Sequence, residues 1–381
     1  MLVLIAAIAA ALGAWSFAAP SGRTFYVSAA GSDRANGLSS RHPWRTVSRV
    51  LRARLRPGDR VLFRGGDTFS GVSLAPRVSG RPGDPIVFGS YGHGLATIGA
   101  ADGAVYLTGG VANLVFRHLT LTTGDSSESA IVKDAPSGPA SVGISVDHCR
   151  LVDSGGAAVL SNQAGATGWS IVDSRIDHVG DSGIIVNGAR PLIAGNVITG
   201  VGWNAALPWN KHGVYVKAAA ATLRGNRIEG FPSDGISLRY PDARVVGNTI
   251  AGGPIGIAYF SYSATPGTSL VEGNVVSGVS QAAFYYDGGA AAGGYPRESF
   301  LIRRNDFDSA GVAIDVRGAS HASIRLDGNK LGGPYSFAFE AVSPVAGSFV
   351  ERGDRILGQP RVLWNGSTMT FAQFRSGQRH P

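Results

Sequence analysis

From residue 61 onward, short runs of alternating apolar and polar residues are separated by Gly, Asn and Asp. Successive side chains of a β-strand point to opposite faces, so this alternation predicts half-buried strands. Clear runs of this kind are residues 60–64, 85–89, 114–117 and 119–121. The pattern therefore predicts an all-β structure made of many short strands.

A four-residue motif recurs through these runs. Gly195-Asn196-Val197-Ile198 returns with its asparagine at Asn226, Asn248, Asn274, Asn305 and Asn329, at intervals of 22 to 31 residues. The repeats hold no helix long enough for leucine-rich repeats, and they are too short for four-stranded propeller blades. We predict a parallel β-solenoid over residues 61–350, in which each repeat is one coil.

The repeated asparagine is predicted to be structural rather than catalytic. It would lie at one turn of every coil, where Asn tolerates left-handed backbone geometry. Stacking would let each side chain hydrogen-bond to its neighbours in the coils above and below.

Both ends of the chain depart from the repeat. Residues 20–60 contain a strand at residues 24–28 and a basic amphipathic helix predicted over residues 46–55. We expect this segment to cap the first open end of the solenoid, because exposed strand edges invite aggregation. Residues 351–381 are predicted to form a C-terminal tail that packs on the solenoid.

Residues 1–19 are apolar and rich in alanine, and Ser16-Phe17-Ala18 offers the small residues that a signal peptidase requires. No Lys or Arg precedes Arg23, so the usual positive n-region is missing. We predict a cleaved secretory signal peptide, with an uncleaved membrane anchor as the alternative. The protein is expected to be secreted or periplasmic in a bacterial-type envelope, free of the membrane after cleavage, and monomeric.

Composition narrows the choice of partners. Hydrophobic residues make up 44% of the chain, and the 55 glycines follow no Gly-X-Y period, which excludes collagen. The net charge of +8 favours anionic partners, and without a block of consecutive basic residues no nucleic acid is expected. Cys149 is the only cysteine, so no intrachain disulfide forms; we interpret it as a buried small residue or a turn residue rather than a catalytic thiol.

The candidate chemistry centres on the strand at residues 213–217. Val214 and Val216 should point inward, and His212, Tyr215 and Lys217 outward or toward the edge. Stacking this strand on its counterparts predicts two outward columns. One column is Ile185, Tyr215, Ser237, Ala258, Tyr285 and Asp315; the other is Asn187, Lys217, Arg239, Phe260, Asp287 and Arg317.

Other polar residues lie around these columns. His212 and Asp234 align one coil apart at the start of the strand. Insertions at residues 203–211 and 288–298 are expected to emerge on one face and shape a binding site. Trp203 and Trp209 in the first insertion either stack on sugar rings or pin the loop to the solenoid.

Three regions make the chain similar to a known family. They are residues 25–33 continued by Pro43-Trp44-Arg45-Thr46, the asparagine repeat between residues 144 and 331, and the closing segments at residues 363–366 and 371–375. With these regions the chain resembles the secreted right-handed parallel β-helix proteins of the pectate-lyase-like superfamily. The resemblance implies a single-stranded right-handed parallel β-helix with a short N-terminal capping helix. It also implies a polysaccharide lyase, hydrolase, epimerase or non-enzymatic surface protein.

A polysaccharide lyase needs a base for the proton next to a uronate carboxylate, a cation for that carboxylate, and an acid for the leaving oxygen. Lys217 beside Arg239 suits this chemistry, because a neighbouring cation favours a neutral lysine and Arg239 can grip a carboxylate with two hydrogen bonds. Tyr215 or Tyr285 would supply the acid, and His212 is the alternative base. The residues predicted to bind the acidic polysaccharide are Asp234, Tyr285, Asp287, Trp209 and Arg317.

Several alternatives stay open. Related lyases use Lys with Arg or Lys with calcium, so Ca²⁺ remains an open cofactor, although the aspartate-rich calcium cluster of pectate lyases is not evident. Asp234 and Asp287, two coils or roughly 10 Å apart, would suit an inverting glycoside hydrolase. Two further alternatives are an epimerase and a non-catalytic glycan-binding or cell-surface structural β-helix. In the non-catalytic protein, the outward cations would simply be solvated surface residues. Asp147-His148 and Asp177-His178 recur one coil apart, too few to indicate a metal site.

Overall fold

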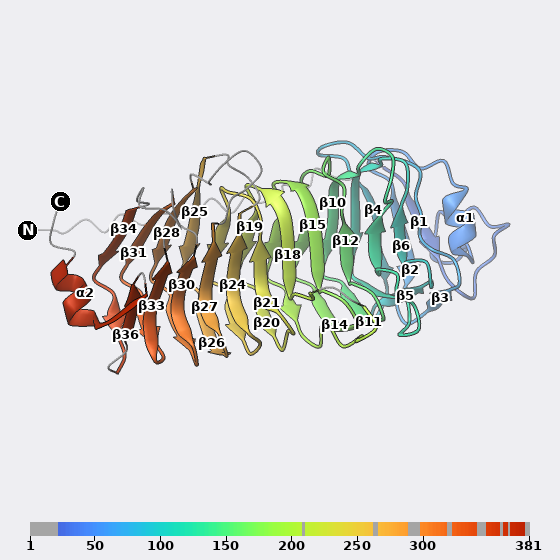
Figure 1. The fold of residues 1–381 in the computed structure, drawn as a ribbon. Coiled ribbons are helices and arrows are strands. Elements are labelled where there is room, and N and C mark those ends of the chain that lie inside the picture. The colour runs from blue at the N-terminus through green and yellow to red at the C-terminus, as the bar shows by residue number, and fades with distance from the viewer. Residues whose placement is uncertain are drawn as a thin grey trace, which may run out of the picture.

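The computed structural model describes residues 22–207, 210–261, 266–288, 298–317, 322–340, 348–358, 361–364 and 366–377. Over these residues the chain winds into one elongated solenoid of stacked parallel strands, with α1 at one end and α2 at the other (Figure 1). Three long sheets run the length of the solenoid, and an ordinary coil gives one strand to each. The predicted all-β parallel solenoid is confirmed.

Sheet 1 has 13 strands. They are β1 (Thr24–Val27), β2 (Arg60–Arg64), β4 (Ile86–Tyr91), β7 (Ala112–Arg117), β10 (Val142–Asp147), β13 (Ser170–Val172), β16 (Leu192–Ala194), β19 (Thr222–Arg224), β22 (Arg244–Val246), β25 (Gly267–Glu272), β28 (Glu298–Arg303), β31 (Ser323–Asp327) and β34 (Ser348–Arg352).

Sheet 2 has 12 strands. They are β3 (Thr68–Ser70), β5 (Ala96–Gly99), β8 (Leu119–Thr122), β11 (Arg150–Ser154), β14 (Arg175–Val179), β17 (Val197–Ile198), β20 (Arg227–Glu229), β23 (Thr249–Ala251), β26 (Val275–Val279), β29 (Asp306–Ser309), β32 (Lys330–Gly332) and β35 (Arg355–Ile356).

Sheet 3 also has 12 strands, and it carries the predicted columns. They are β6 (Val105–Leu107), β9 (Val132–Asp134), β12 (Val159–Ser161), β15 (Ile184–Ala189), β18 (Val214–Ala219), β21 (Asp234–Leu238), β24 (Ile255–Phe260), β27 (Ala282–Asp287), β30 (Val312–Arg317), β33 (Tyr335–Glu340), β36 (Arg361–Trp364) and β37 (Ser367–Thr370).

The alternating pattern places the core inside the solenoid. In β18, Val214 and Val216 are fully buried, while Tyr215 and Lys217, which alternate with them, stay half-exposed. Equivalent inward residues stack from coil to coil, as in the Phe88 and Phe116 rings, whose centroids lie 5.3 Å apart. Stacking therefore buries one continuous apolar core, which is the main source of stability in such a fold.

The repeated asparagines form a hydrogen-bonded ladder at the turn between sheets 1 and 2. Nδ2 of Asn226 donates to Oδ1 of Asn248 at 2.8 Å, and the backbone N of Asn226 donates to the same oxygen at 3.0 Å. Equivalent bonds continue along the solenoid through Asn196, Asn226, Asn248, Asn274, Asn305 and Asn329 to Asp354. The predicted structural ladder is confirmed.

The backbone geometry of this turn differs from the prediction. The left-handed conformation belongs to the residue before each asparagine, such as Gly225 at φ +62° and Arg304 at φ +54°. The asparagine itself keeps negative φ and turns its amide into the coil. Glycine at the preceding position avoids the Cβ clash that makes left-handed geometry costly for other residues.

The N-terminal cap is present in a shorter form than predicted. Helix α1 spans Val47–Leu51, and Oγ1 of Thr46 caps it by accepting a hydrogen bond from the backbone N of Arg49 at 3.1 Å. Val47 and Val50 are buried against the first coil. Strand β1 pairs with β2, so it is already the first strand of sheet 1.

At the other end, the coils continue past the predicted boundary at residue 351. Strand β35 pairs with β32 and β36 pairs with β33, both in parallel, so they extend sheets 2 and 3. The chain then reverses, because β37 pairs with β36 in the antiparallel direction. Helix α2 (Phe371–Gly377) follows and buries Phe374, so the part of the tail that covers the solenoid end begins only at β37.

Two further expectations concern the termini and the cysteine. The predicted signal peptide, residues 1–19, lies outside the described residues. None of the helices in the described ranges has the length and apolar character needed to cross a membrane. Cys149 is buried, and burial raises the pKa of its thiol to about 12, which fits the interpretation as a small core residue.

Candidate functional site

The two predicted columns lie in register on the outer face of sheet 3. In the first, Tyr215 pairs with Ile185 on one side and Ser237 on the other, and Tyr285 pairs with Ala258 and Asp315. In the second, Lys217 pairs with Asn187, and Asp287 pairs with Phe260 and Arg317. These pairs confirm the stacking inferred from the repeat, while Arg239 directly follows the end of β21 at Leu238.

Tyr215 lies at the centre of a cluster of cations and aromatic rings. Nζ of Lys217 lies 4.9 Å from the centroid of the Tyr215 ring, and Cζ of Arg239 lies 4.7 Å from the same centroid. The guanidinium of Arg239 also lies 4.5 Å from the Phe260 ring, so two aromatic residues flank it. Cations are attracted to ring faces, which explains how two positive charges from adjacent coils can share this position.

Arg239 is held more firmly than a surface arginine. Its Nη1 donates to Oγ of Ser237 at 2.8 Å and to the carbonyl O of Leu238 at 2.9 Å. Although it lies in an outward column, Arg239 is only 7% exposed, and the Tyr215 and Phe260 rings lie against its guanidinium. The interpretation of Arg239 as solvated surface is therefore wrong.

His212 and Asp234 meet one coil apart, as their alignment predicts, but inside the structure. Both side chains are 4% exposed, and Nδ1 of His212 lies 3.1 Å from Oδ2 of Asp234. The His212 ring contacts the inner side of the cluster, with its centroid 5.0 Å from that of Tyr215. The expected outward or edge position of His212 is thus corrected: Asp234 holds the imidazole behind Tyr215.

A second polar cluster adjoins the first along the same face. Arg317 donates from Nη2 to Oδ2 of Asp315 at 2.9 Å, and the hydroxyl of Tyr285 lies 3.5 Å from Oδ2 of Asp287. Burial raises the pKa of Tyr285 to about 12, and the Asp287 carboxylate acts in the same direction. The Phe260 and Tyr285 rings, 5.3 Å apart, join the two clusters.

The structure does not support Asp234 and Asp287 as a hydrolase pair. Asp234 aligns through Ile255 with Ala282, five residues before Asp287. Two coils across and five residues along the strand amount to roughly 19 Å. An inverting glycosidase requires carboxyl groups about 6.5–9.5 Å apart, and Asp234 is buried against His212 as well.

The structure describes more of the first predicted insertion than of the second. Trp209 and most of residues 288–298 lie outside the described residues. The Trp203 ring stacks on the His178 ring with centroids 5.1 Å apart, so it pins the first insertion to the solenoid. The Lys211 ammonium donates to the carbonyl O of Asn204 and closes that loop.

Sequence reasoning missed Lys133, which extends the first column. Lys133 pairs with Tyr106 on one side and Leu160 on the other, and Leu160 leads to Ile185. Its Nζ lies 4.4 Å from the Tyr106 ring centroid and donates to Oγ of Ser129 at 2.6 Å. Desolvation lowers the pKa of Lys133. The asparagine motif begins only after this coil, so no repeat marked the position.

Glu298 was also missed, because it stood at the end of an insertion. It is 1% exposed, and its Oε1 accepts hydrogen bonds from Oγ of Ser261 at 2.8 Å and from the hydroxyl of Tyr259 at 3.3 Å. Burial raises the pKa of Glu298 to about 7, and the hydrogen bonds oppose this only partly. Nothing in the local sequence indicates a buried carboxyl.

Two groups of three side chains could offer metal-ligand atoms within the described residues. One contains Asp147, His148 and Asp173, and the other Asp125, Asp153 and His178. The first group contains both members of the pair Asp147-His148. The second group contains His178 but not its sequence neighbour Asp177. Most of these side chains are exposed, and an exposed acidic group does not by itself indicate a metal site.

Comparisons with known proteins agree with this architecture. The family described as "Right handed beta helix region" matches residues 141–331, half of the chain, while no curated protein sequence matches. Similar solved structures include XylC with xylose (10% identity, 86% of each chain covered, TM-score 0.60). They also include the A-module of the Azotobacter vinelandii mannuronan C-5 epimerase AlgE6 (13% identity, 78% and 91% covered, TM-score 0.53) and pectate lyase Pel9A (13% identity, 87% and 79% covered, TM-score 0.53). At such identities the likeness is one of fold. The chain belongs to the right-handed β-helix family.

Proposed function

We propose that the protein is a secreted or periplasmic polysaccharide lyase that cleaves a uronate-containing glycan by β-elimination. The observation that carries this proposal is the placement of Lys217 and Arg239, from adjacent coils, on the single ring of Tyr215. One half-exposed lysine, one fixed guanidinium and one phenol thus occupy a small part of the outer face. The fold's likeness to a pectate lyase and a mannuronan epimerase supports an acidic glycan as substrate.

Each group has a definite part in the reaction. Arg239 binds the uronate carboxylate and stabilises the negative charge that builds on it when the adjacent C5 proton leaves. Nζ of Lys217 accepts that proton. The C4–O4 bond then breaks as the C4–C5 double bond forms, and the hydroxyl of Tyr215 protonates the leaving oxygen.

The surrounding residues position these three. The buried Asp234–His212 pair supports the inner side of the Tyr215 ring. Tyr285, Asp287 and Arg317 lie farther along the same face and would bind neighbouring sugar units. The hydroxyl of Tyr285 serves there as a hydrogen-bond donor, and its raised pKa keeps it protonated well above neutral pH.

Ultraviolet absorbance tests the proposal directly. The mature protein is incubated with a panel of uronate polysaccharides, with and without calcium. We expect absorbance from the unsaturated product on at least one polymer, lost in Lys217→Ala and retained in Lys330→Ala. Lys330 is a matched control, because it lies on sheet 2 in an exposed ion pair with Asp306.

The other outcomes would replace the proposal with a different one. New reducing ends without absorbance would indicate a hydrolase, and a change of sugar configuration by NMR without cleavage would indicate an epimerase. Retained glycan binding without any product would indicate a non-catalytic binding protein. A rise in absorbance that persists in Lys217→Ala would keep the lyase and reject this residue as its base.

A further inference from the structure

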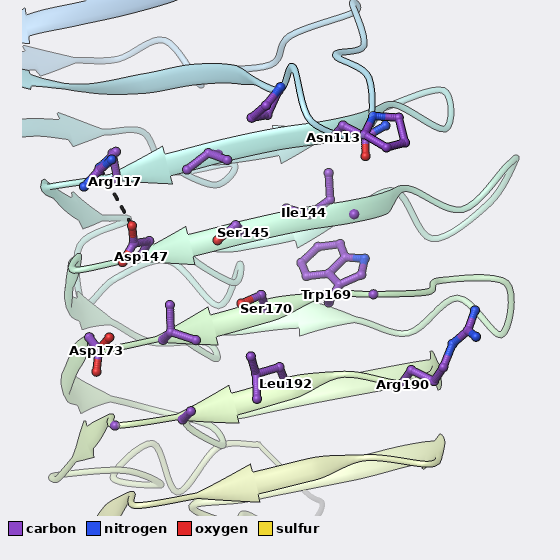
Figure 2. A pocket seen from close by; sticks show the side chains of 18 of the residues that line it. Asn113, Arg117, Ile144, Ser145, Asp147, Trp169, Ser170, Asp173, Arg190 and Leu192 are labelled. Atoms are coloured by element: carbon purple, nitrogen blue, oxygen red, sulfur yellow. Dashed lines mark ion pairs between the residues drawn. The ribbon is translucent and has the colours of Figure 1, made fainter. Parts of the chain in front are cut away.

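A groove crosses the outer face of sheet 1 (Figure 2). The Tyr215 cluster lies on a different sheet, sheet 3. Its volume is about 1100 Å³, and its lining residues extend from β4 to β22. The floor is made of outward residues in register. One row runs through Val115, Ser145, Ser170 and Leu192, and the other through Arg117, Asp147, Val172, Ala194 and Arg224.

The rims of the groove explain why the sheet face is hollow here. At one end, Arg81 and Asp84 exchange backbone hydrogen bonds of 3.1 and 3.0 Å, and the turn they close stands beside the sheet as a wall. Along one side, the corners after β19 and β22 are Gly225 and Gly247, where an added Cβ would meet nothing within 4 Å. These two corners leave that end of the groove open, whereas His148 and Asp173 occupy the equivalent corners after β10 and β13.

Positive charge exceeds negative charge around the groove. Four arginines line it: Arg81, Arg117, Arg190 and Arg224. The two carboxylates are Asp147 and Asp173, and Asp147 is already engaged by Nδ1 of His148 at 2.5 Å and Nε of Arg117 at 3.8 Å (Figure 2). Arg190 and Arg224 are exposed.

The spacing of the charges suits an extended polyanion. Arg117 and Arg224 lie in the same row four strands apart, which is roughly 19 Å. Between them the floor carries the half-exposed apolar side chains of Val172 and Leu192 and the hydroxyls of the adjacent Ser145 and Ser170. Binding sites for small molecules combine such an apolar surface with a few well-placed polar groups.

We propose that this groove binds an anionic oligosaccharide whose sugar units carry carboxylates. The arginines pair with the carboxylates, the valine and leucine side chains contact the C–H faces of the rings, and the serines hydrogen-bond to sugar hydroxyls. The groove binds the polymer without catalysing a reaction, on a different face from the proposed catalytic cluster. The binding proposal holds whether or not that cluster is a lyase.

A local reporter distinguishes this groove from the sheet 3 face. Thr222 follows Leu192 in the first row, at the edge of the groove, so Thr222→Cys accepts an environment-sensitive fluorophore there. Cys149 will not compete for the label, because it is buried and its thiol pKa is raised to about 12. The probe is a galacturonate hexamer, with a neutral xylose hexamer as the control ligand.

In the labelled protein, Arg190→Gln combined with Arg224→Gln should weaken hexagalacturonate binding at least tenfold. The charge-matched control, Arg150→Gln with Arg227→Gln on exposed positions of sheet 2, should bind as the parent does. Lys217→Ala should also leave the signal unchanged, because it lies on sheet 3. Binding should weaken as salt concentration rises.

Four results would overturn the proposal. Equal binding of the neutral hexamer, or undiminished binding by the double arginine variant, would remove the charge recognition on which it rests. Loss of the signal in Lys217→Ala would move the binding to the other face.

Analytical ultracentrifugation tests whether a second copy of the chain occupies the groove instead. A dimer that dissociates in Ser145→Trp, with no sugar binding, would make the groove a dimer interface. A protein that binds in the groove yet gives no unsaturated product would contradict only the lyase.

Discussion

At the scale of single residues, Arg239 shows how an outward position in a β-solenoid can still be buried. Its guanidinium lies between the Tyr215 and Phe260 rings, and Nη1 is bound to Ser237 and Leu238. A guanidinium is planar, so it can stack on rings and present paired donors to a carboxylate at the same time. A lysine ammonium at this position would keep the charge and lose both properties.

Arg239→Lys should therefore lower kcat/KM on the best uronate polymer about 100-fold, because it weakens the stabilisation of charge in the transition state. Arg150→Lys, on exposed sheet 2, should keep the parent rate. Initial rates of absorbance give the comparison, and circular dichroism checks the fold. A rate equal to that of the parent would show that the carboxylate is bound elsewhere.

Glu298 links a single buried group to the pH dependence of stability. Burial raises its pKa from an ordinary value of 4.5 to about 7, so the folded protein retains a proton that the unfolded chain loses. The stability contributed by the protonated carboxyl is full below about pH 4.5 and is lost as the pH rises through about 7. Asp354, whose pKa burial also raises to about 7, adds a slope of the same sign.

Glu298→Gln keeps the shape of the protonated acid and removes its titration. The variant should be more stable than the parent at pH 8, by up to roughly 3 kcal/mol, and close to it at pH 4.5. Thermal unfolding across this range measures the difference, and Glu128→Gln in an exposed loop is the control. Parallel stability curves for the variant and the parent would show that Glu298 is not the titrating group.

At the scale of structural elements, the turn between sheets 1 and 2 combines two devices. A left-handed residue such as Gly247 turns the chain, and the following Asn248 ties the coil to its neighbours. Oδ1 of Asn248 accepts from both N and Nδ2 of Asn226, and its Nδ2 donates to the carbonyl O of Leu223. Because all these groups are buried, water cannot replace a lost partner.

Asn248→Ala should therefore lower the free energy of unfolding by about 3 kcal/mol, since it leaves several buried polar groups unsatisfied. Asn187→Ala removes the same amide from a half-exposed position and should cost far less. Urea unfolding of both variants tests the comparison. Equal losses would mean that the ladder contributes no more than a surface asparagine.

At the scale of the whole molecule, stability depends on covering both ends of the stack. At the C-terminal end, the Phe374 ring lies 5.1 Å from Trp364, 5.5 Å from Phe337 and 5.9 Å from Phe349, measured between centroids. Arg375 fastens α2 to the last coil by donating from Nη2 and Nε to Glu351 at 2.6 and 2.8 Å. The helix thus covers aromatic core residues that would otherwise meet solvent.

Phe374→Asp should expose this aromatic cluster and place a charge against it. We expect a loss of roughly 3 kcal/mol or more in the C-terminal coils and soluble aggregates at high protein concentration. Light scattering and thermal unfolding detect these effects, with Gln373→Asp on the exposed side of α2 as the control. A monomeric Phe374→Asp protein of parent stability would mean that α2 is dispensable as a cap.

The sequence alone determined the solenoid, the ladder at Asn226 and its equivalents, and the register that aligns Lys217 with Asn187 and Tyr285 with Asp315. These features follow from local periodicity, because alternation fixes which side chains face inward and the repeat fixes which residues stack. Only the tertiary structure decided how deeply a side chain is buried.

Three features depend on neighbours that are 20 or more residues away in the chain. They are the burial of His212 against Asp234, the packing of aromatic rings on Arg239 and the burial of Glu298. The end of the coils at β36 and the groove on sheet 1 were equally hidden from the sequence. Periodicity describes the faces of each strand, whereas exposure, charge pairing and hollows arise from what the other coils and loops place beside it.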